Sequence, residues 1–258
     1  MLFTVITIVT AATFATALST AIFWPKVRAA AKVFSKTLSV LIPARNEEPN
    51  LPACLDTILT QREVILEILV YDDHSIDSTQ AIIQSYAAQY PLLKLVPASS
   101  LPPGWCGKNY ACAQLAKVAQ GKWLLFLDAD ARLGANAINC MLAEAEARQL
   151  TFLSCWPKFE MQSLAEKCLM PMLNFVVFSI YPSLLALGQK PELRRKAGLG
   201  LAHGACMLFE RASYQAFGGH AQVKDQIFED TRIAQLWRAS GRNGLCLDGR
   251  WCSVPFYA

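Results

Sequence analysis

Charged residues are scarce in this chain of 258 residues, because Lys, Arg, Asp and Glu together make up only 17% of it. The formal net charge of +4 is small and the basic residues are not clustered, so nucleic acid is not an expected partner. The mean hydropathy of +0.27 is high for a freely soluble enzyme and indicates partial contact with a bilayer. A chain of this length can bury one large α/β core, with or without a small appendage.

Cys-x-x-Cys pairs are also absent, although the chain contains nine cysteines. An odd number of cysteines without such pairs indicates neither a disulfide framework nor a zinc knuckle. We expect most of them to be small buried hydrophobic residues in a reducing compartment. They are Cys54, Cys106, Cys112, Cys140, Cys155, Cys168, Cys206, Cys246 and Cys252.

No charged residue occurs between Met1 and Trp24. A helix of that length is about long enough to cross a hydrocarbon core of roughly 30 Å. Residues 1–25 are therefore predicted to form a transmembrane anchor.

Basic residues follow this apolar stretch, namely Lys26, Arg28, Lys32 and Lys36. A signal peptide has the opposite order, with basic residues first, so the anchor is expected to stay uncleaved. The positive-inside tendency then places the rest of the chain in the cytoplasm. Residues 26–37 are predicted to be a juxtamembrane tether, with Ala31–Ser35 as its short linking part.

A second charge-free run extends from Cys168 to Gly188 and contains Pro171, Asn174 and Pro182. Three interpretations are open: a buried core helix, an interfacial or re-entrant segment, and a full membrane span. A full span would separate the acidic residues near position 230 from those near position 130, which argues against it. The membrane-interfacial interpretation of residues 168–188 is favoured.

Short apolar, β-rich runs alternate with segments of helical length between Leu38 and Cys155, which is typical of a mixed, mainly parallel sheet flanked by helices. This pattern predicts one α/β domain over residues 38–258. The predicted strands are Leu38–Pro43, Ile65–Tyr71, Leu92–Val96, Lys122–Leu127 and Thr151–Cys155. The predicted helices are Asn50–Thr60, Ser78–Gln89, Lys108–Ala119 and Ala135–Arg148. Ligands of such sheets bind beyond the carboxyl ends of the strands, so those ends are the candidate site.

Polar residues follow the first two predicted strands. The segment Pro43–Pro49 follows the first, and a helix-capping loop is the simplest explanation for it. After the second strand, Asp77 and Gln80 have the spacing of a capping box. Capping does not explain the adjacent pair Asp72 and Asp73, whose carboxylates are the acceptors that a uracil imide and ribose hydroxyls need.

The fourth predicted strand runs directly into Asp128-Ala129-Asp130. Residues two apart on an extended chain point the same way, so both carboxylates are expected to face one spot. Oxygen ligands of this kind suit Mg²⁺ or Mn²⁺, which bind through one or two carboxylates and substrate phosphates. Most isolated Asp-x-Asp sequences are surface turns, but this one ends a strongly apolar strand and has a second acidic pair at another strand end.

A turn-rich loop, Leu101–Lys108, ends at the start of a predicted helix. Its backbone N–H groups and Lys108 have the chemistry to hold a diphosphate. An ordinary connecting loop with an exposed lysine is an equally good interpretation.

Two further segments are candidates for the acceptor side. Ala202–Phe209 contains a glycine turn that leads into a strand, and Phe228–Arg232 opens a helix that reaches Ala239. Acidic residues in a first helical turn are normally favourable partners of the helix dipole. The other interpretation is a carboxylate base that deprotonates an acceptor hydroxyl.

Together these motifs resemble the family 2 glycosyltransferases of the GT-A fold, over Leu38–Leu247. Their order is Pro43-x-Arg45-Asn46-Glu47, Asp72-Asp73-x-Ser75-x-Asp77-x-Thr79, Asp128-x-Asp130 and Glu229-Asp230. The stretch Pro102–Lys108 is similar to a narrower branch associated with hopanoid and carotenoid glycosylation.

The resemblance implies that Asp73 contacts the nucleobase, that Asp128 contacts the ribose or sugar, and that Asp130 binds a divalent cation, Mn²⁺ or Mg²⁺, with Asp128 beside it. It also implies that Asp230 is the catalytic base of an inverting transfer from a nucleotide-diphosphate sugar, with a UDP-sugar expected, to a lipid hydroxyl. The implied donor-binding residues are Pro43, Arg45, Glu47, Asp73, Lys108 and Asp128. The implied acceptor-side residues are His203, Gly204 and Glu229.

The sequence departs from this family in two ways. It lacks the Gln-x-x-Arg-Trp motif of processive polysaccharide synthases, which argues against a polymerase. Members of the lipid branch usually continue into further membrane helices, whereas this chain stops at Ala258, which motivates an alternative as an inactive, membrane-tethered nucleotide-sugar-binding protein. A nucleotidyltransferase is the other alternative, although a Gly-rich phosphate loop does not follow the first predicted strand.

Overall fold

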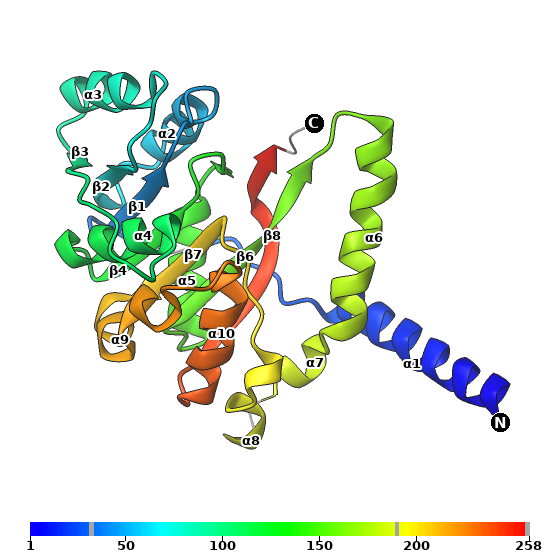
Figure 1. The fold of residues 1–258 in the computed structure, drawn as a ribbon. Helices are drawn as coiled ribbons and strands as arrows, with labels where there is room; N and C mark the ends of the chain where they lie inside the picture. Colours follow the sequence, from blue (N-terminus) through cyan, green and yellow to red (C-terminus); the bar gives the residue numbers. More distant parts are fainter. Residues whose placement is uncertain (31–33, 189–190, 256–258) are drawn as a thin grey trace.

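A single curled sheet forms the centre of the protein (Figure 1). The computed structural model describes residues 1–30, 34–188 and 191–255. The strands in this part of the chain are β1 (Leu38–Ala44), β2 (Ile65–Asp72), β3 (Leu93–Val96), β4 (Trp123–Leu127), β5 (Arg132–Leu133), β6 (Phe152–Glu160), β7 (Cys206–Glu210) and β8 (Gly244–Pro255). Their order in the sheet is β3-β2-β1-β4-β7-β6-β8-β5.

The sheet has two parts with different strand directions. Strands β3, β2, β1 and β4 are parallel neighbours. Strand β7 then runs antiparallel to both β4 and β6, whereas β6 and β8 are parallel. The mixed, mainly parallel sheet predicted from the sequence is confirmed, and the carboxyl ends of β1, β2 and β4 lie at one edge.

Helices cover both faces of the sheet (Figure 1). In the described part of the chain they are α1 (Leu2–Phe23), α2 (Leu51–Leu59), α3 (Thr79–Gln89), α4 (Gly107–Val118), α5 (Ala137–Ala147), α6 (Leu164–Ile180), α7 (Ser183–Ala186), α8 (Pro191–Arg194), α9 (Arg211–Phe217) and α10 (Glu229–Ala239), with 3-10 turns η1 (Ala197–Leu199) and η2 (Gly219–Val223). Val40 and Ile42 of β1 pack in the core shared with α2, α3 and α5. Leu41 points to the other face and packs with α4, α9 and α10. This alternation follows from the two-residue period of a strand.

The second part of the sheet differs from the prediction. Strand β6 continues to Glu160, and neither β8 nor β5 is predicted by the apolar pattern. Strand β8 contains the polar stretch Asp248-Gly249-Arg250, where its register against β6 shifts. A Cβ atom at position 249 would lie 1.7 Å from the Trp156 carbonyl oxygen, so only glycine permits this close pairing.

Helix α1 extends away from the sheet (Figure 1). Ala17 and Thr20 are buried, whereas large apolar side chains such as Phe3, Ile8 and Phe14 are exposed. Within the described residues, α1 is the one helix long and apolar enough to cross a membrane. Its length and exposure agree with the predicted anchor.

The segment after α1 packs against the domain. The Val27 N–H donates to Asp248 Oδ1 (3.0 Å), and the Asp248 N–H donates to the Pro25 carbonyl (2.8 Å). The Phe34 N–H donates to Asn139 Oδ1 of α5 (3.0 Å). Residues 31–33 of the predicted tether lie outside the described residues. Its described parts are held on β8 and α5, in contrast to a free linker.

The charge-free run 168–188 is divided between two helices. Helix α6 begins at Leu164 and ends at Ile180, and the shorter α7 follows Tyr181 and Pro182. Along α6, large side chains such as Leu169, Phe175 and Ile180 are exposed. This exposure argues against the buried core helix.

Two smaller expectations have different outcomes. All nine cysteines are free and seven are buried, which confirms their role as small hydrophobic residues. The capping box at Asp77 and Gln80 is wrong, because Ser78 precedes α3 and no side-chain cap forms there. A capping box does form at α6, where Ser163 and Glu166 bond each other's backbone N–H groups.

Candidate functional site

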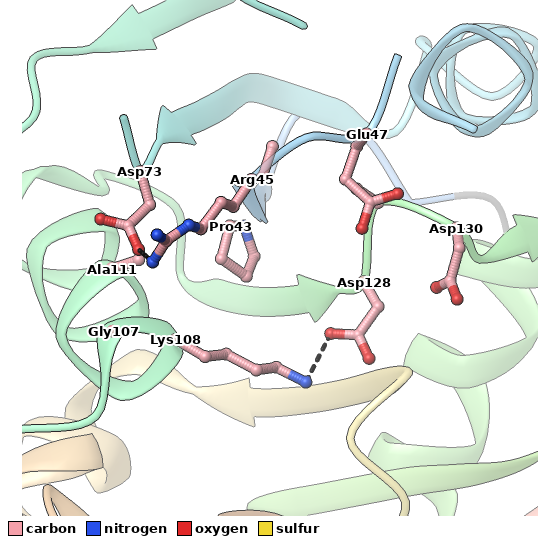
Figure 2. A pocket seen from close by; sticks show the side chains of 11 residues that line it. Pro43, Arg45, Glu47, Asp73, Gly107, Lys108, Ala111, Asp128 and Asp130 are labelled. Atoms are coloured by element: carbon pink, nitrogen blue, oxygen red, sulfur yellow. Dashed lines mark ion pairs between the residues drawn. The ribbon is translucent and has the colours of Figure 1, made fainter. Parts of the chain in front are cut away.

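A pocket of about 350 Å³ lies beyond the carboxyl ends of β1, β2 and β4 (Figure 2). Every residue predicted to bind the donor or the metal lines it. The lining residues are Pro43, Ala44, Arg45, Glu47, Asp73, Gly107, Lys108, Ala111, Asp128, Ala129 and Asp130. The parallel strand ends therefore bring together residues that are up to 87 positions apart, from position 43 to position 130.

The loops after β1 and β2 hold each other in place. The Asn46 N–H donates to Ser75 Oγ (2.9 Å), and the Glu47 N–H donates to Thr79 Oγ1 (2.8 Å). The Glu48 N–H donates to Asp77 Oδ2 (3.1 Å). Asp77 also accepts the N–H of Thr79, the first residue of α3, at 3.0 Å, so its carboxylate binds both the helix start and the first loop. The polar residues of the second loop thus position the first.

Asp73 lies at the far side of this pocket, next to Arg45 (Figure 2). The Arg45 guanidinium lies 3.6 Å from Asp73 Oδ2 and is mostly exposed, whereas the Asp73 side chain is 18% exposed. A Cβ atom on Gly107, at the start of α4, would lie 2.8 Å from the same carboxylate oxygen. The absence of a side chain at position 107 therefore lets Asp73 approach the helix N-terminus.

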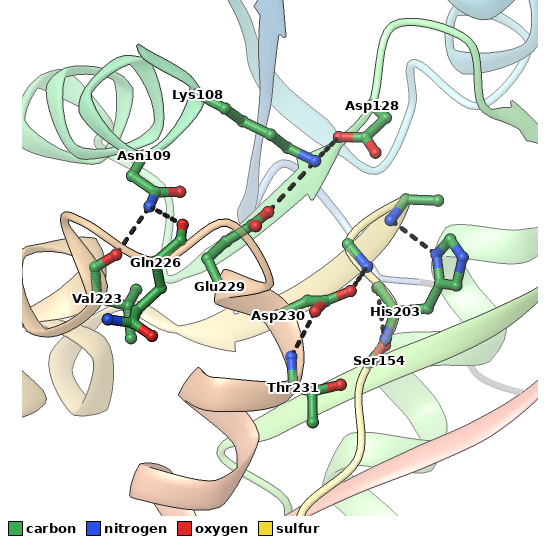
Figure 3. Close-up of polar contacts among 12 residues, drawn as sticks. Lys108, Asn109, Asp128, Ser154, His203, Val223, Gln226, Glu229, Asp230 and Thr231 are labelled. Atoms are coloured by element: carbon green, nitrogen blue, oxygen red, sulfur yellow. Dashed lines mark hydrogen bonds and ion pairs between the residues drawn. The ribbon is translucent and has the colours of Figure 1, made fainter. Parts of the chain in front are cut away.

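Lys108 connects the pocket to the acceptor-side residues (Figure 3). Its Nζ atom lies 2.7 Å from Asp128 Oδ1 and 3.3 Å from Glu229 Oε1. Burial alone would lower the pKa of Lys108, but the two carboxylates outweigh it and raise the pKa above its usual value. The lysine stays charged, and no diphosphate contact is needed to explain its position.

The carboxyl group of Asp130 has a raised pKa. Burial, together with the nearby charges of Asp128 and Glu47, raises the pKa of Asp130 to about 6. Burial also raises the pKa of Glu47, although Asn50 donates a hydrogen bond to it (3.0 Å). The raised pKa values of Asp130 and Glu47, next to the Asp128 carboxylate, indicate a site that favours a cation.

The backbone of this acidic segment is not extended as expected. The Ala131 N–H donates to the Asp128 carbonyl (3.0 Å), so residues 128–131 form a turn. Both carboxylates still line the pocket. Within the described residues, no cluster of three or more His, Cys, Asp or Glu side chains is placed to hold a metal ion. Two carboxylates are nevertheless a suitable donor set for Mg²⁺ or Mn²⁺, which take further oxygens from water and phosphate.

Asp230 lies beside this pocket at the start of α10 (Figure 3). Its Oδ2 atom accepts the Gly204 N–H at 2.8 Å. His203 is fixed from both sides, because its backbone N–H donates to Ser154 Oγ (2.9 Å) and its Nδ1 accepts the Ala205 N–H (3.2 Å). Burial lowers the pKa of His203, so its imidazole is neutral at pH 7. The four acceptor-side candidates therefore form one contiguous group with Lys108.

Two residues of the site are missed by the sequence reasoning. Gly107 is needed for the close approach of Asp73, and a glycine at a helix start next to an acidic strand end is the only sequence signal for it. Asn109 of α4 is buried, and its Nδ2 donates to the carbonyls of Val223 (2.8 Å) and Gln226 (2.9 Å). It positions the loop that leads to Glu229 (Figure 3).

Comparison with known proteins places this chain in a family. The family model described as "Glycosyl transferase family 2" matches residues 39–218. The chain belongs to glycosyl transferase family 2. The family predicted from the motif order is thereby confirmed.

Curated relatives with matching sequences are glycosyltransferases. The 4,4'-diaponeurosporenoate glycosyltransferase of Staphylococcus haemolyticus (strain JCSC1435) is 27% identical over 205 residues, which cover 79% of this chain and 52% of that protein. The enzyme of the same name from Staphylococcus aureus (strain MRSA252) is 26% identical over 207 residues, covering 78% and 51%. The chain spans about half the length of these relatives. The expected resemblance to the carotenoid-associated branch is confirmed.

Solved structures share the fold. The mannosyltransferase PcManGT from Pyrobaculum calidifontis, in complex with GDP-Man and Mn²⁺, matches with a TM-score of 0.66 and 20% identity, over 98% of this chain and 68% of that chain. TarS 1–349 from S. aureus, in complex with UDP-GlcNAc, matches with a TM-score of 0.58 and 15% identity, over 86% and 59%. These matches confirm the GT-A-like α/β fold.

Proposed function

We propose that this chain is a membrane-attached glycosyltransferase that moves a sugar from a nucleotide-diphosphate donor to the hydroxyl group of an isoprenoid or other lipid. A UDP-sugar is the proposed donor, since the carboxylate of Asp73, which lines the pocket, is an acceptor that suits a uracil imide. The relatives named as 4,4'-diaponeurosporenoate glycosyltransferases support a lipid acceptor.

One observation carries the proposal. A strand-end pocket collects Asp73, Asp128 and Asp130, and Lys108 links Asp128 to Glu229, the residue next to Asp230. Lys108 therefore connects the pocket to the helix start that carries the proposed base. Transfer between two bound substrates requires that the donor pocket and the base for the acceptor lie side by side.

The donor-side residues have distinct proposed roles. Asp73 contacts the nucleobase, with Arg45 placed beside it, and Pro43 and Glu47 shape the pocket wall. The N–H groups at the start of α4 and the Lys108 ammonium bind the diphosphate. Asp128 and Asp130 would hold a divalent cation, Mn²⁺ or Mg²⁺, which supplies neutralisation of the negative charge on the diphosphate leaving group.

The proposed reaction is a direct displacement with inversion at the anomeric carbon. The acceptor oxygen forms the new bond to that carbon as the bond to the diphosphate oxygen breaks. The hydroxyl proton passes to Asp230, and the nucleoside diphosphate leaves with the bonding electrons. The N–H of Gly204, which donates to Asp230, orients the base, and the neutral His203 precedes Gly204.

We further propose that residues 1–25 anchor the protein in the membrane and that the domain from residue 38 onward lies in the cytoplasm. The exposed apolar surface of α1 supports the anchor, and the basic residues behind it support the orientation. The exposed apolar side chains of α6 support contact with the membrane interface.

The test uses the full-length chain in lipid nanodiscs. UDP-glucose, UDP-N-acetylglucosamine and GDP-mannose, each labelled in the sugar, are incubated with membrane lipid extract and with Mn²⁺, Mg²⁺ or a chelator. We expect metal-dependent release of nucleoside diphosphate and a labelled lipid product with one UDP-sugar.

Other results identify the alternatives. Donor binding without hydrolysis or transfer, under all of these conditions, contradicts the enzyme and supports a tethered binding protein. Release of pyrophosphate from a nucleoside triphosphate and a sugar phosphate supports a nucleotidyltransferase. Transfer from GDP-mannose alone preserves the enzyme but contradicts the UDP-sugar.

A further inference from the structure

A second, mostly apolar cavity of about 510 Å³ lies between α1, α6 and the end of β6. Its volume is within the range of about 300–1,000 Å³ that is typical of small-molecule pockets. The lining residues are Phe14, Ala17, Leu18, Ala21, Pro157, Lys158, Phe159, Met161, Met170, Pro171, Asn174, Phe175 and Phe178. We call this cavity the helix groove. Small side chains on α1 leave the space, and aromatic side chains of α6 face it.

The inner end of the helix groove is closed by packed residues. Thr20 Oγ1 donates to the Tyr181 carbonyl at 2.7 Å and ties the end of α1 to the end of α6. The Trp24 ring packs on Phe178 and Tyr181, with ring centroids 4.9 and 5.6 Å apart. The groove is therefore a fixed feature between two joined helices.

The helix groove continues toward the acceptor-side residues. Its lining residue Asn174 accepts a hydrogen bond from Trp156 Nε1 (3.2 Å). The rings of Trp156 and Phe159 both contact the His203 ring edge-on, with centroids 5.3 and 5.8 Å away. His203 precedes Gly204, whose N–H binds Asp230. The groove residue Phe159 thus contacts His203, the neighbour of the glycine that binds the proposed base.

We propose that the helix groove binds the hydrocarbon chain of the lipid acceptor and presents its hydroxyl end to His203 and Asp230. This inference rests on the proposed function. It adds a place for the acceptor and a limit on its length, since 510 Å³ holds on the order of 15–20 carbon atoms if each occupies about the 30 Å³ of a water molecule.

The dimensions and surroundings of the groove favour a single lipid chain over a protein segment. An α-helix is about 10–12 Å across and fills roughly 400–600 Å³ in each turn, so the groove would accept about one turn. The outer surfaces of α1 and α6 expose large apolar side chains, as expected of helices in contact with a bilayer. A chain from the bilayer reaches the groove without crossing water.

The experiment compares two substitutions on the same helix. Ala21 is exposed and lines the helix groove, so Ala21→Phe fills it without disturbing the core. Ala15 is also exposed but does not line the groove, so Ala15→Phe is the matched control. The full-length proteins are placed in nanodiscs with geranylgeraniol that carries a photoreactive diazirine at its hydrocarbon end, and the labelled peptides are mapped by mass spectrometry.

We expect the label on α1 residues 14–21 and α6 residues 170–178 in the wild type and in Ala15→Phe. Ala21→Phe should lose at least tenfold of that label, since each displaced methylene group weakens binding by about fourfold. Phe175→Ala, which removes contact from the α6 wall, should lower labelling severalfold and serves as an independent second variant. Affinity for UDP with Mn²⁺ should be unchanged in all variants.

Equal labelling of Ala21→Phe and Ala15→Phe overturns the proposal, because the chain then contacts these helices only as bulk lipid. A change of oligomeric state in Ala21→Phe alone also overturns it and indicates a contact between copies of the chain. Labelling needs neither donor nor transfer. If the groove binds the probe in a protein without transferase activity, the proposed function is contradicted, and the groove remains a hydrocarbon-binding site whose occupant is not an acceptor.

Discussion

The proposed donor side and the proposed acceptor side of the site are built differently. The donor side uses the ends of three adjacent parallel strands, and its first two loops are joined by hydrogen bonds from Asn46, Glu47 and Glu48. The acceptor side is assembled from β6, the turn before β7, the start of α10 and the two exposed helices α1 and α6. The order of adjacent parallel strands thus determines the donor side, and packing between distant segments determines the acceptor side.

Helix α4 connects the two sides. Lys108 and Asn109 both belong to α4, at the border of the donor pocket. Lys108 pairs with Glu229, and Asn109 binds the loop that precedes it. Helix α4 therefore connects the donor side to the acceptor side. Substitutions on the donor side should change donor binding, whereas substitution of Asp230 should change transfer alone.

The largest effect is expected from Asp130→Asn. Removing one of two carboxylates from the proposed metal site should lower metal-dependent turnover about a thousandfold, equivalent to about 4 kcal/mol of lost leaving-group stabilisation. Turnover and Mn²⁺ affinity are measured together, and circular dichroism checks the fold. Glu63→Gln, which removes an exposed charge from the same half, is the control. Turnover near that of the wild type would refute the metal assignment.

The acceptor side should respond differently, with loss of transfer and retention of donor binding. Asp230→Asn should lower transfer at least a hundredfold, because a positioned base contributes about 10²–10⁴ to such a step. The asparagine oxygen can still accept the Gly204 N–H, so affinity for UDP with Mn²⁺ should stay within about twofold. Asp225→Asn, an exposed change in the preceding loop, should transfer normally.

Glu229 is the rival for this role. Because Glu229 pairs with Lys108, Glu229→Gln should alter donor affinity as well as transfer. The assignment of Asp230 is wrong if Glu229→Gln abolishes transfer with donor binding preserved while Asp230→Asn remains active.

The same contrast explains what the sequence can predict. The parallel strands and their helices follow from local apolar alternation, and their bounds agree with the structure within a few residues. The donor-side residues could be grouped because parallel strand ends meet at one edge. Strand β8 was missed because Asp248 and Arg250 interrupt its apolar pattern, and its pairing depends on the contact of Gly249 with Trp156.

Long-range contacts account for the other differences. The packing of residues 25–27 on Asp248 joins positions more than 200 residues apart, and no local pattern signals it. The same is true of the pairing of Lys108 with Glu229, which gives the lysine a partner other than phosphate. The spacing at Asp77 and Gln80 suggests a capping box, but Ser78 is the N-cap, and the Asp77 carboxylate binds the N–H groups of Thr79 and Glu48.

Substitution of two glycines, one on each side of the site, should have smaller effects that again differ between donor and acceptor binding. Gly107→Ala should weaken affinity for UDP about tenfold, because the new Cβ would lie 2.8 Å from Asp73 and displace that carboxylate by an amount that costs about 1–2 kcal/mol. Gly204→Ala places a Cβ 3.2 Å from Lys108 Nζ and 3.6 Å from Asp230 Oδ2. It should raise the acceptor KM about threefold and leave UDP affinity within about twofold. Calorimetry measures the UDP affinity of each variant, and steady-state kinetics measures the acceptor KM. Equal effects of the two substitutions on UDP affinity would contradict the separation of the donor side from the acceptor side.

The last effect concerns pH and His220, which lies in η2. His220 Nδ1 lies 2.6 Å from the Tyr214 hydroxyl, and the imidazole packs 4.7 Å from the Phe126 ring. Burial, assisted by the charge of Lys108, lowers the pKa of His220 to about 3. In the unfolded chain a histidine has a pKa of about 6.5.

Above pH 6.5 the histidine is neutral in both states and has no effect on the pH dependence of stability. Below it the unfolded chain binds a proton that the folded protein does not, so the free energy of unfolding should fall by up to about 1.4 kcal/mol per pH unit between about pH 6.5 and 3. Asp130 acts in the opposite direction between about pH 6 and 4, since its pKa is raised in the folded protein. The difference between the wild type and His220→Gln, which cannot titrate, isolates the histidine. Urea unfolding in nanodiscs from pH 7 to pH 5 should show a steeper loss for the wild type by about 1–2 kcal/mol, and parallel curves would mean that His220 is protonated in the folded protein.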